Sequence, residues 1–160
     1  MNKQILLDKI LSHLTSEHLT LVEAATSARA ASTDEESIAE TQYDTLAIEA
    51  SYLAEGQANR AKALALDIAK LKETPLHAYT AYMPINIGAL VQIDDIEKGE
   101  LWFFITHSGA GFNTTINQIP VTIITTQSPL GKAMIGKQVD DEIKLTLAHK
   151  QLLATIIKVV

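Results

Sequence analysis

The first 74 residues contain no proline and a single glycine, Gly56. Because proline interrupts a helix and glycine weakens one, such a stretch can form unusually long helices. All four prolines and the other six glycines follow residue 74. This change in composition predicts two domains, a helical one at residues 1–74 and a second one at residues 75–160.

Apolar residues in the first half recur at alternating spacings of four and three. This pattern is typical of the seam of a coiled coil. In the first helical stretch the seam comprises Leu7, Leu11, Leu14, His18, Leu21, Ala25 and Ala28. In the second it comprises Tyr43, Ala47, Ala50, Ala54, Gln57, Ala61, Leu64, Ile68 and Leu71, and Leu46 and Leu53 broaden the apolar face. We therefore expect an antiparallel helical hairpin whose alanines let the helices approach closely.

The segment that joins the two helical stretches, residues 32–41, is acidic. It holds Asp34, Glu35, Glu36 and Glu40, and no Lys or Arg occurs from residue 30 to residue 59. Thr33 and Ser37 are each followed three residues later by a glutamate, as in a capping box, so the acids could simply start the second helix. Alternatively, carboxylates at the tip of a hairpin could help to hold a divalent cation whose other ligands come from a partner.

Residues 75–160 alternate short apolar runs with turn residues. Strands are predicted at 88–94, 101–106 and 120–126, a Gly-rich loop at 108–115, and a closing hairpin at 142–147 and 152–159. Ser128 followed by Pro129 predicts a short helix that ends at Gly136. The predicted fold class is α+β, with an N-terminal antiparallel helical hairpin followed by an antiparallel sheet domain with one short helix.

Composition excludes several classes of function. The net charge of −6 argues against nonspecific binding to nucleic acid or anionic membrane, and the lack of cysteine excludes disulfides and thiolate chemistry. His77, His107 and His149 lack metal-ligand spacing. No apolar run reaches the ~20 residues of a membrane span. We expect a cytoplasmic protein, a monomer or weak dimer, that binds no membrane, no specific DNA sequence and no metal stably.

The run at 128–137, SPLGKAMIGK, followed by Asp140, Asp141 and Glu142, resembles the C-terminal domain of the Gre transcript-cleavage factors. Residues 43–58 are similar to the second helix of GreA/GreB-like proteins. The chain is identified by this resemblance as a divergent GreA/GreB-like member. The resemblance implies an FKBP-like fold for residues 75–160.

Gre-like proteins bind bacterial RNA polymerase. The resemblance implies that the C-terminal domain docks at the rim of the polymerase secondary channel, with Ser128, Pro129, Leu130, Lys132 and Met134 as candidates. It implies that the hairpin enters the channel, where acids at the tip help to hold a second Mg²⁺ of the polymerase, so that the protein has no cofactor and no catalysis of its own. The candidates are Asp34, Glu35, Glu36 and Glu40, which match the family by location and charge but not by spacing.

Three functions remain open at this stage. The first is an elongation regulator that occupies the channel, with or without stimulating the cleavage of backtracked RNA. The second is an FKBP-like isomerase or chaperone, although the aromatic residues near Trp102 are few for a prolyl-binding pocket. The third is a structural protein whose coiled-coil seam pairs between chains.

Overall fold

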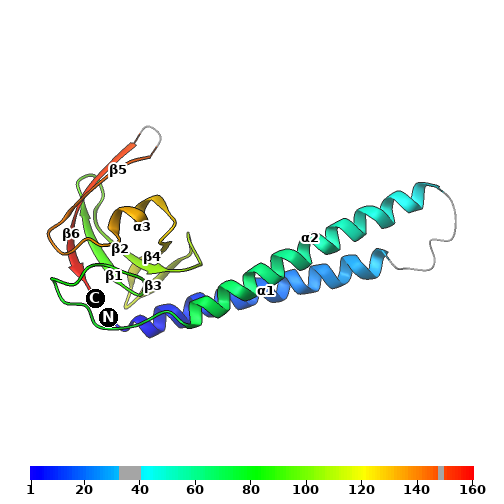
Figure 1. Ribbon diagram of the computed structural model, residues 1–160, viewed down its shortest axis with the longest axis horizontal. Coiled ribbons are helices and arrows are strands. Elements are labelled where there is room, and N and C mark those ends of the chain that lie inside the picture. The colour runs from blue at the N-terminus through cyan, green and yellow to red at the C-terminus, as the bar shows by residue number, and fades with distance from the viewer. Residues whose placement is uncertain (33–40, 148–149) are drawn as a thin grey trace. The chain divides into compact units, whose positions relative to one another are not determined.

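The computed structural model of the protein describes residues 1–32, 41–147 and 150–160. These residues form two compact units, one made of residues 12–69 and the other of residues 1–11 together with 70–160. The elements of both units are labelled in Figure 1. The predicted domain limits, 1–74 and 75–160, follow the change in composition and stay a prediction.

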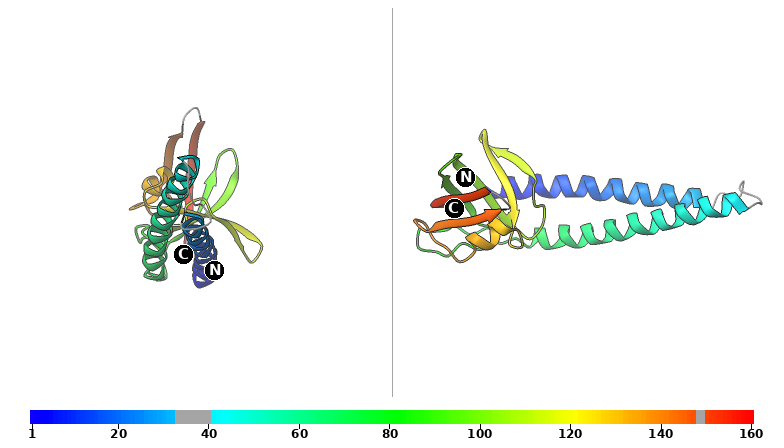
Figure 2. Two further views of the ribbon diagram at one scale, coloured as in Figure 1. Left: turned by 90° about the vertical axis from the view of Figure 1, so that its right-hand side faces the viewer. Right: turned by 90° about the horizontal axis from the view of Figure 1, so that it is seen from above.

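The unit of residues 12–69 is an antiparallel pair of helices. It contains most of α1 (Lys3–Ser32) and α2 (Thr41–Lys72), which run side by side in opposite directions (Figure 2). The described seam residues of both helices are buried or half-buried, as shown by Leu14, Ala28 and Ala61 at 5–9% exposure. The predicted hairpin is therefore confirmed, and its seam is filled within a single chain.

One part of the helical prediction lies outside the described residues, and another part is wrong. The predicted start of the second helix, at Thr33 or Ser37, lies outside the described residues. Leu53 does not broaden the buried face, since it is 56% exposed. The facing part of α1, residues 24–31, is rich in alanine, whose side chain is too short to cover a leucine at the edge of the seam.

The second unit is built on one six-stranded sheet, ordered β3-β4-β2-β1-β6-β5. The strands are β1 (Leu90–Asp95), β2 (Gly99–Thr106), β3 (Asn113–Ile116), β4 (Ile119–Thr125), β5 (Glu142–Leu147) and β6 (Lys150–Val159). The short helix α3 (Pro129–Met134) follows β4 in the sequence. Every predicted strand and the predicted helix are present, so the α+β class is confirmed.

The sheet is mixed, whereas the prediction was a purely antiparallel one. β2 and β4 pair in parallel, with Phe104 opposite Ile123. The cause is β3, which lies partly within the predicted loop at 108–115 and turns back into β4 at Asn117 and Gln118. Their φ angles of 50° and 67° suit a tight hairpin turn, which needs two consecutive positive values. β4 consequently starts at the same end of the sheet as β2.

One face of the sheet carries a core shared with α3. Alternation along the strands puts Val91 and Ile93 of β1 and Ile105 of β2 on this face, where Met134 of α3 packs among them. All four side chains have 0% exposure. Burying each such side chain contributes roughly 1.5–3 kcal/mol to folding.

The opposite face carries a second row of buried residues. Register places Leu90 beside Phe104 and Phe104 beside Ile123, and all three are 0% exposed. Helix ends from the same unit supply three further fully buried side chains, which are Leu6, Ile10 and Leu71. The first turns of α1 and the last turn of α2 thus contribute buried apolar side chains to the sheet unit.

Candidate functional site

The sequence predicted a site in two parts, and the structure describes one of them. The acids Asp34, Glu35, Glu36 and Glu40 lie outside the described residues. The docking candidates lie on α3 and in the turn before it. The site is therefore built here from α3 and the segments that pack beside it.

The start of α3 is fixed by Ser128. Its side-chain oxygen accepts a hydrogen bond from the amide of Gly131 at 3.1 Å and donates one to the carbonyl of Thr125 at 2.7 Å. Pro129 occupies the first turn, as predicted. Gly131 must lack a side chain, because a Cβ there would come within 2.0 Å of the Thr125 oxygen. The Ser-Pro motif thus serves first to seat the helix tightly against the end of β4.

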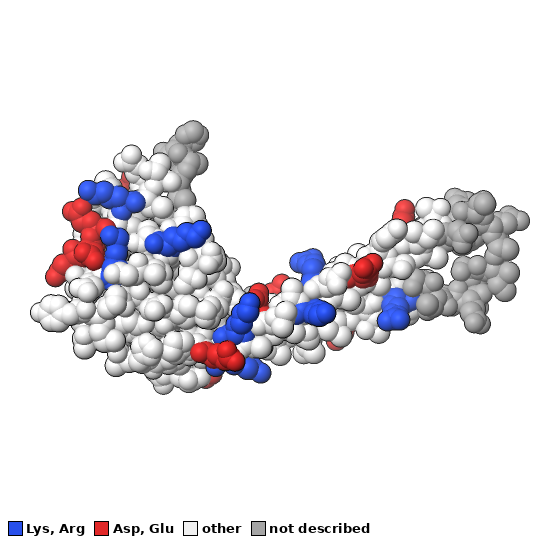
Figure 3. All heavy atoms as spheres, in the orientation of Figure 1, with Lys and Arg blue, Asp and Glu red and all other residues white. Residues whose placement is uncertain are grey.

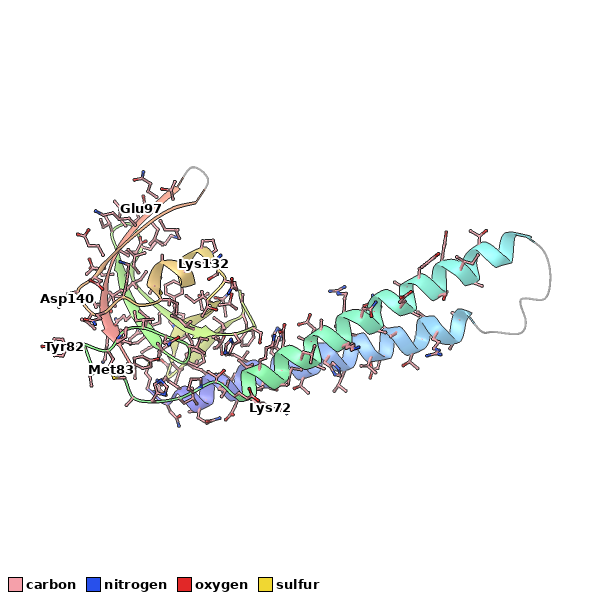
Figure 4. The ribbon with its side chains drawn as sticks, viewed as in Figure 1. Lys72, Tyr82, Met83, Glu97, Lys132 and Asp140 are labelled. Atoms are coloured by element: carbon pink, nitrogen blue, oxygen red, sulfur yellow. The ribbon has the colours of Figure 1, made fainter. Side chains whose placement is uncertain are left out.

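The docking candidates differ in exposure. Pro129 and Lys132 are exposed, and the side chain of Lys132 is shown in Figure 4, whereas Leu130 is half-buried against the core. Met134 is 0% exposed and belongs to the core, so the prediction that it contacts a partner is wrong. A six-residue helix that packs on a sheet by its last turn has no free face at that position.

The acidic pair after α3 has a structural role. A carboxylate oxygen of Asp141 accepts a hydrogen bond from the amide of Gln138 at 2.8 Å. Asp140 adopts a φ of 73°, and its amide donates to the carbonyl of Ile156 at 2.8 Å. These bonds close the turn that leads into β5. The side chain of Asp140 stays exposed.

Sequence reasoning missed a turn that is bonded to the segment after α3. The amide of Met83 donates to the carbonyl of Thr80 at 3.1 Å, which closes a turn over residues 80–83. Tyr82, in this turn, is 86% exposed, and Met83 is 36% exposed (Figure 4). Only Pro84, which follows directly, pointed to an irregular backbone here. We call residues 80–83 the Tyr82 turn.

A buried lysine was also missed. The ammonium of Lys3 donates to the carbonyls of His77 at 2.5 Å and Val160 at 2.8 Å, and it lies 4.9 Å from the ring centroid of Tyr79. Lys3 is 8% exposed. Burial lowers the pKa of Lys3 and raises that of Tyr79. The group ties the start of α1 to the segment before β1 and to the end of β6.

Charges of both signs surround α3. A hollow of about 380 Å³ is lined by Ala133, Lys137, Glu142 and Lys144, and Lys144 pairs with Glu142 at 3.1 Å. Figure 3 shows basic and acidic side chains next to each other on this unit. Within residues 1–32, 41–147 and 150–160, no group of three or more His, Asp or Glu side chains could hold a metal ion. No helix in the described part has the combination of length and hydropathy of a membrane span.

Most of the sheet unit matches a known protein family. Residues 84–160 match the family model for the C-terminal domain of the transcription elongation factors GreA and GreB. Over residues 84–160 the chain is similar to the GreA/GreB family. The resemblance seen at 128–142 is thus confirmed, and the capped α3 and the Asp140 turn lie within the matched residues. No curated protein matches the chain.

Solved structures similar to the chain are also GreA-related. Gfh1 of Thermus thermophilus, a GreA factor homolog, is 18% identical, with 96% of this chain and 94% of that chain covered and a TM-score of 0.38. Gfh1 of Thermus aquaticus is 19% identical, with 95% and 92% covered and a TM-score of 0.38. A GreA/GreB elongation factor from Nitrosomonas europaea is 18% identical, with 62% and 78% covered and a TM-score of 0.33.

Proposed function

We propose that this protein regulates transcription elongation by binding RNA polymerase and inserting its helical hairpin into the secondary channel. The observation that carries the proposal is the match of residues 84–160 to the GreA/GreB family, on the same chain as an antiparallel helix pair. The family is one of transcription elongation factors, and the hairpin supplies the element that would enter the polymerase.

The hairpin has dimensions suited to a channel. α2 has 32 residues, which corresponds to about 48 Å at 1.5 Å per residue. Four of its nine seam positions are alanine, and Ala47, Ala54 and Ala61 are buried or half-buried toward α1, so the two helices can approach closely there. A long and narrow helix pair can reach a buried catalytic centre without displacing the channel walls.

The segment between the helices gives the proposal its chemistry. Carboxylates such as those of Asp34 and Glu36 are ligands that Mg²⁺ prefers, and two of them hold the ion weakly unless other ligands come from a partner. The protein would thus assist a Mg²⁺ of the polymerase while the polymerase itself cleaves the RNA. In this proposal the chain is a regulator and not an enzyme.

The test is RNA cleavage in a stalled, backtracked elongation complex with Mg²⁺. Wild type is compared with Asp34→Ala/Glu36→Ala, and the matched control is Glu49→Ala/Glu55→Ala, which removes two exposed acids from the side of α2. Cleavage that is lost only in the tip variant would support both channel insertion and Mg²⁺ assistance. Binding without cleavage would make the protein a regulator that occupies the channel. Failure of the wild type to bind core polymerase at micromolar concentration would refute the proposal.

A further inference from the structure

The Tyr82 turn exposes more apolar surface than folding of the unit requires. At 86% exposure, Tyr82 exceeds every other large hydrophobic side chain that the structure describes, and Met83 beside it is 36% exposed. Single exposed apolar residues are common, but an adjacent tyrosine and methionine make a patch of the residue types enriched where proteins meet. The Tyr82 side chain contributes little to the fold, so its exposure calls for another role.

The backbone beneath the patch is held firmly. The amide of Val139 donates to the carbonyl of Ala81 at 3.4 Å, and the amide of Ile85 donates to the carbonyl of Lys137 at 2.8 Å. The amide of Gly136 donates back to the carbonyl of Ile85 at 2.9 Å. The turn is therefore fastened on both sides to the segment after α3. A surface that is already ordered loses little conformational entropy on binding.

An exposed acid borders the patch. Asp140 follows Val139, which is bonded to Ala81, and its exposed side chain lies at the same end of the unit as Tyr82 and Met83 (Figure 4). The surface thus presents an acid beside an apolar centre. Such an arrangement suits a protein surface with matching charges, whereas nucleic acid would be repelled by Asp140.

We propose that the Tyr82 turn is an anchor that docks into an apolar slot on a protein partner, next to an arginine. The arginine would stack on the ring of Tyr82 and pair with the carboxylate of Asp140. As an extension of the proposed function, we take the partner to be RNA polymerase. The turn would then provide the apolar contact that the buried Met134 cannot make.

The test measures binding of the full-length chain to core RNA polymerase at several salt concentrations. Tyr82→Ser/Met83→Ser is expected to weaken binding about tenfold or more, because exposed aromatic anchors dominate interface energetics. The matched control, Ile96→Ser, removes another side chain of the same unit that is 78% exposed and should bind like the wild type. Thermal unfolding should be unchanged in Ile96→Ser and in Tyr82→Ser alone, because these side chains are 78% and 86% exposed, and Tyr82→Ser alone should still weaken binding.

A second variant tests the charge pairing. Asp140→Asn keeps a residue type that tolerates the positive φ of 73°, so the turn should fold as before. It should weaken binding severalfold at low salt and less at high salt. If the wild type binds and both variants bind equally well, the anchor is refuted while the proposed function stands. If the wild type fails to bind, both proposals are refuted.

Discussion

The two compact units bury their apolar residues in different ways. In the described chain, the large side chains that are fully buried, such as Phe104 and Ile105, all lie in residues 1–11 and 70–160. In the unit of residues 12–69, Leu19, Tyr52 and Leu66 are all more than half exposed. A groove of about 540 Å³ remains there between the helices, lined by Ala25, Thr26, Arg29, Ser51, Ala54, Glu55 and Ala58.

The difference shows where stability resides. Interlocked large side chains give the sheet unit a cooperative core, whereas short alanines give the hairpin a narrow but weakly packed seam. Local opening should therefore begin in the hairpin, since regions with few buried apolar contacts open at low free energy. A substitution at a buried position of the sheet unit should lower the free energy of unfolding strongly, whereas a substitution in the hairpin should lower it little.

The largest effect is expected from Phe104→Ala. Removing a fully buried phenylalanine should lower the free energy of unfolding by about 3–5 kcal/mol. Its counterpart in the hairpin, Tyr52→Ala, should change it by less than about 0.5 kcal/mol, because Tyr52 is 72% exposed. Urea unfolding followed by the fluorescence of Trp102 reports on the sheet unit, and far-ultraviolet circular dichroism of the same samples reports on the helices of the hairpin. Equal costs would show that the two units do not differ in packing.

Replacing one glycine in each unit by alanine should change the stability of the protein in opposite directions. At Gly88, a Cβ would lie 1.8 Å from the carbonyl oxygen of Pro75, and φ is 84°, so Gly88→Ala should destabilise by about 2–4 kcal/mol. At Gly56, in α2, nothing lies within 4 Å of such a Cβ, so Gly56→Ala should stabilise by about 0.5–1 kcal/mol. Melting temperatures of both variants test this. A loss at Gly56 would mean that the helices pack more closely than the seam indicates.

One polar residue of the seam, Gln57, has a buried side-chain oxygen without a hydrogen-bond partner. Gln57→Leu should therefore stabilise the protein by about 1 kcal/mol, since the unpaired oxygen is removed from the interior. Asn59→Leu, at an exposed site of the same helix, is the control and should gain almost nothing. Hydrogen exchange of α2 amides would locate the gain, and slower exchange only outside α2 would contradict it.

The smallest expected effect is a pH dependence of the stability of the sheet unit. Burial lowers the pKa of Lys3 in the folded chain below 10.5, the value of an exposed lysine. Between the pKa of the folded chain and that of the unfolded chain, the unfolded chain binds more protons, so stability rises with pH. The raised pKa of Tyr79 makes stability fall above pH 10 in wild type and variant alike. Subtracting the stability of Lys3→Met from that of the wild type should thus leave a difference that grows with pH in the alkaline range. A difference independent of pH would show that Lys3 is not desolvated.

Features set by local periodicity were predictable from the sequence. The seam through Leu14, Ala28 and Ala61 follows from spacing alone, and the Ser128 cap follows from two adjacent residues. The parallel pairing of β2 with β4 was not predictable, because it depends on the positive φ angles of Asn117 and Gln118, neither of which is glycine. Residue type alone does not predict the turn at Asn117 and Gln118.

The candidate site was predictable only in part. The motif at 128–137 located α3, but a helix of six residues is too short for periodicity to show which face is buried, so Met134 was misplaced. The exposure of Tyr82 depends on backbone bonds to residues 137 and 139, some 55 positions away along the chain. Lys3 likewise gains its partners only when distant segments meet.

The bond from Lys3 to Val160 also bears on how the protein is made. It joins positions 157 apart in the sequence, and β6 must insert between β1 and β5 before the sheet is complete. On the ribosome, the helix pair has all its contacts as soon as residue 69 has emerged, whereas the sheet unit must wait for residue 160. Local contacts form faster than distant ones, so we expect synthesis to yield a preformed hairpin before the sheet unit is complete.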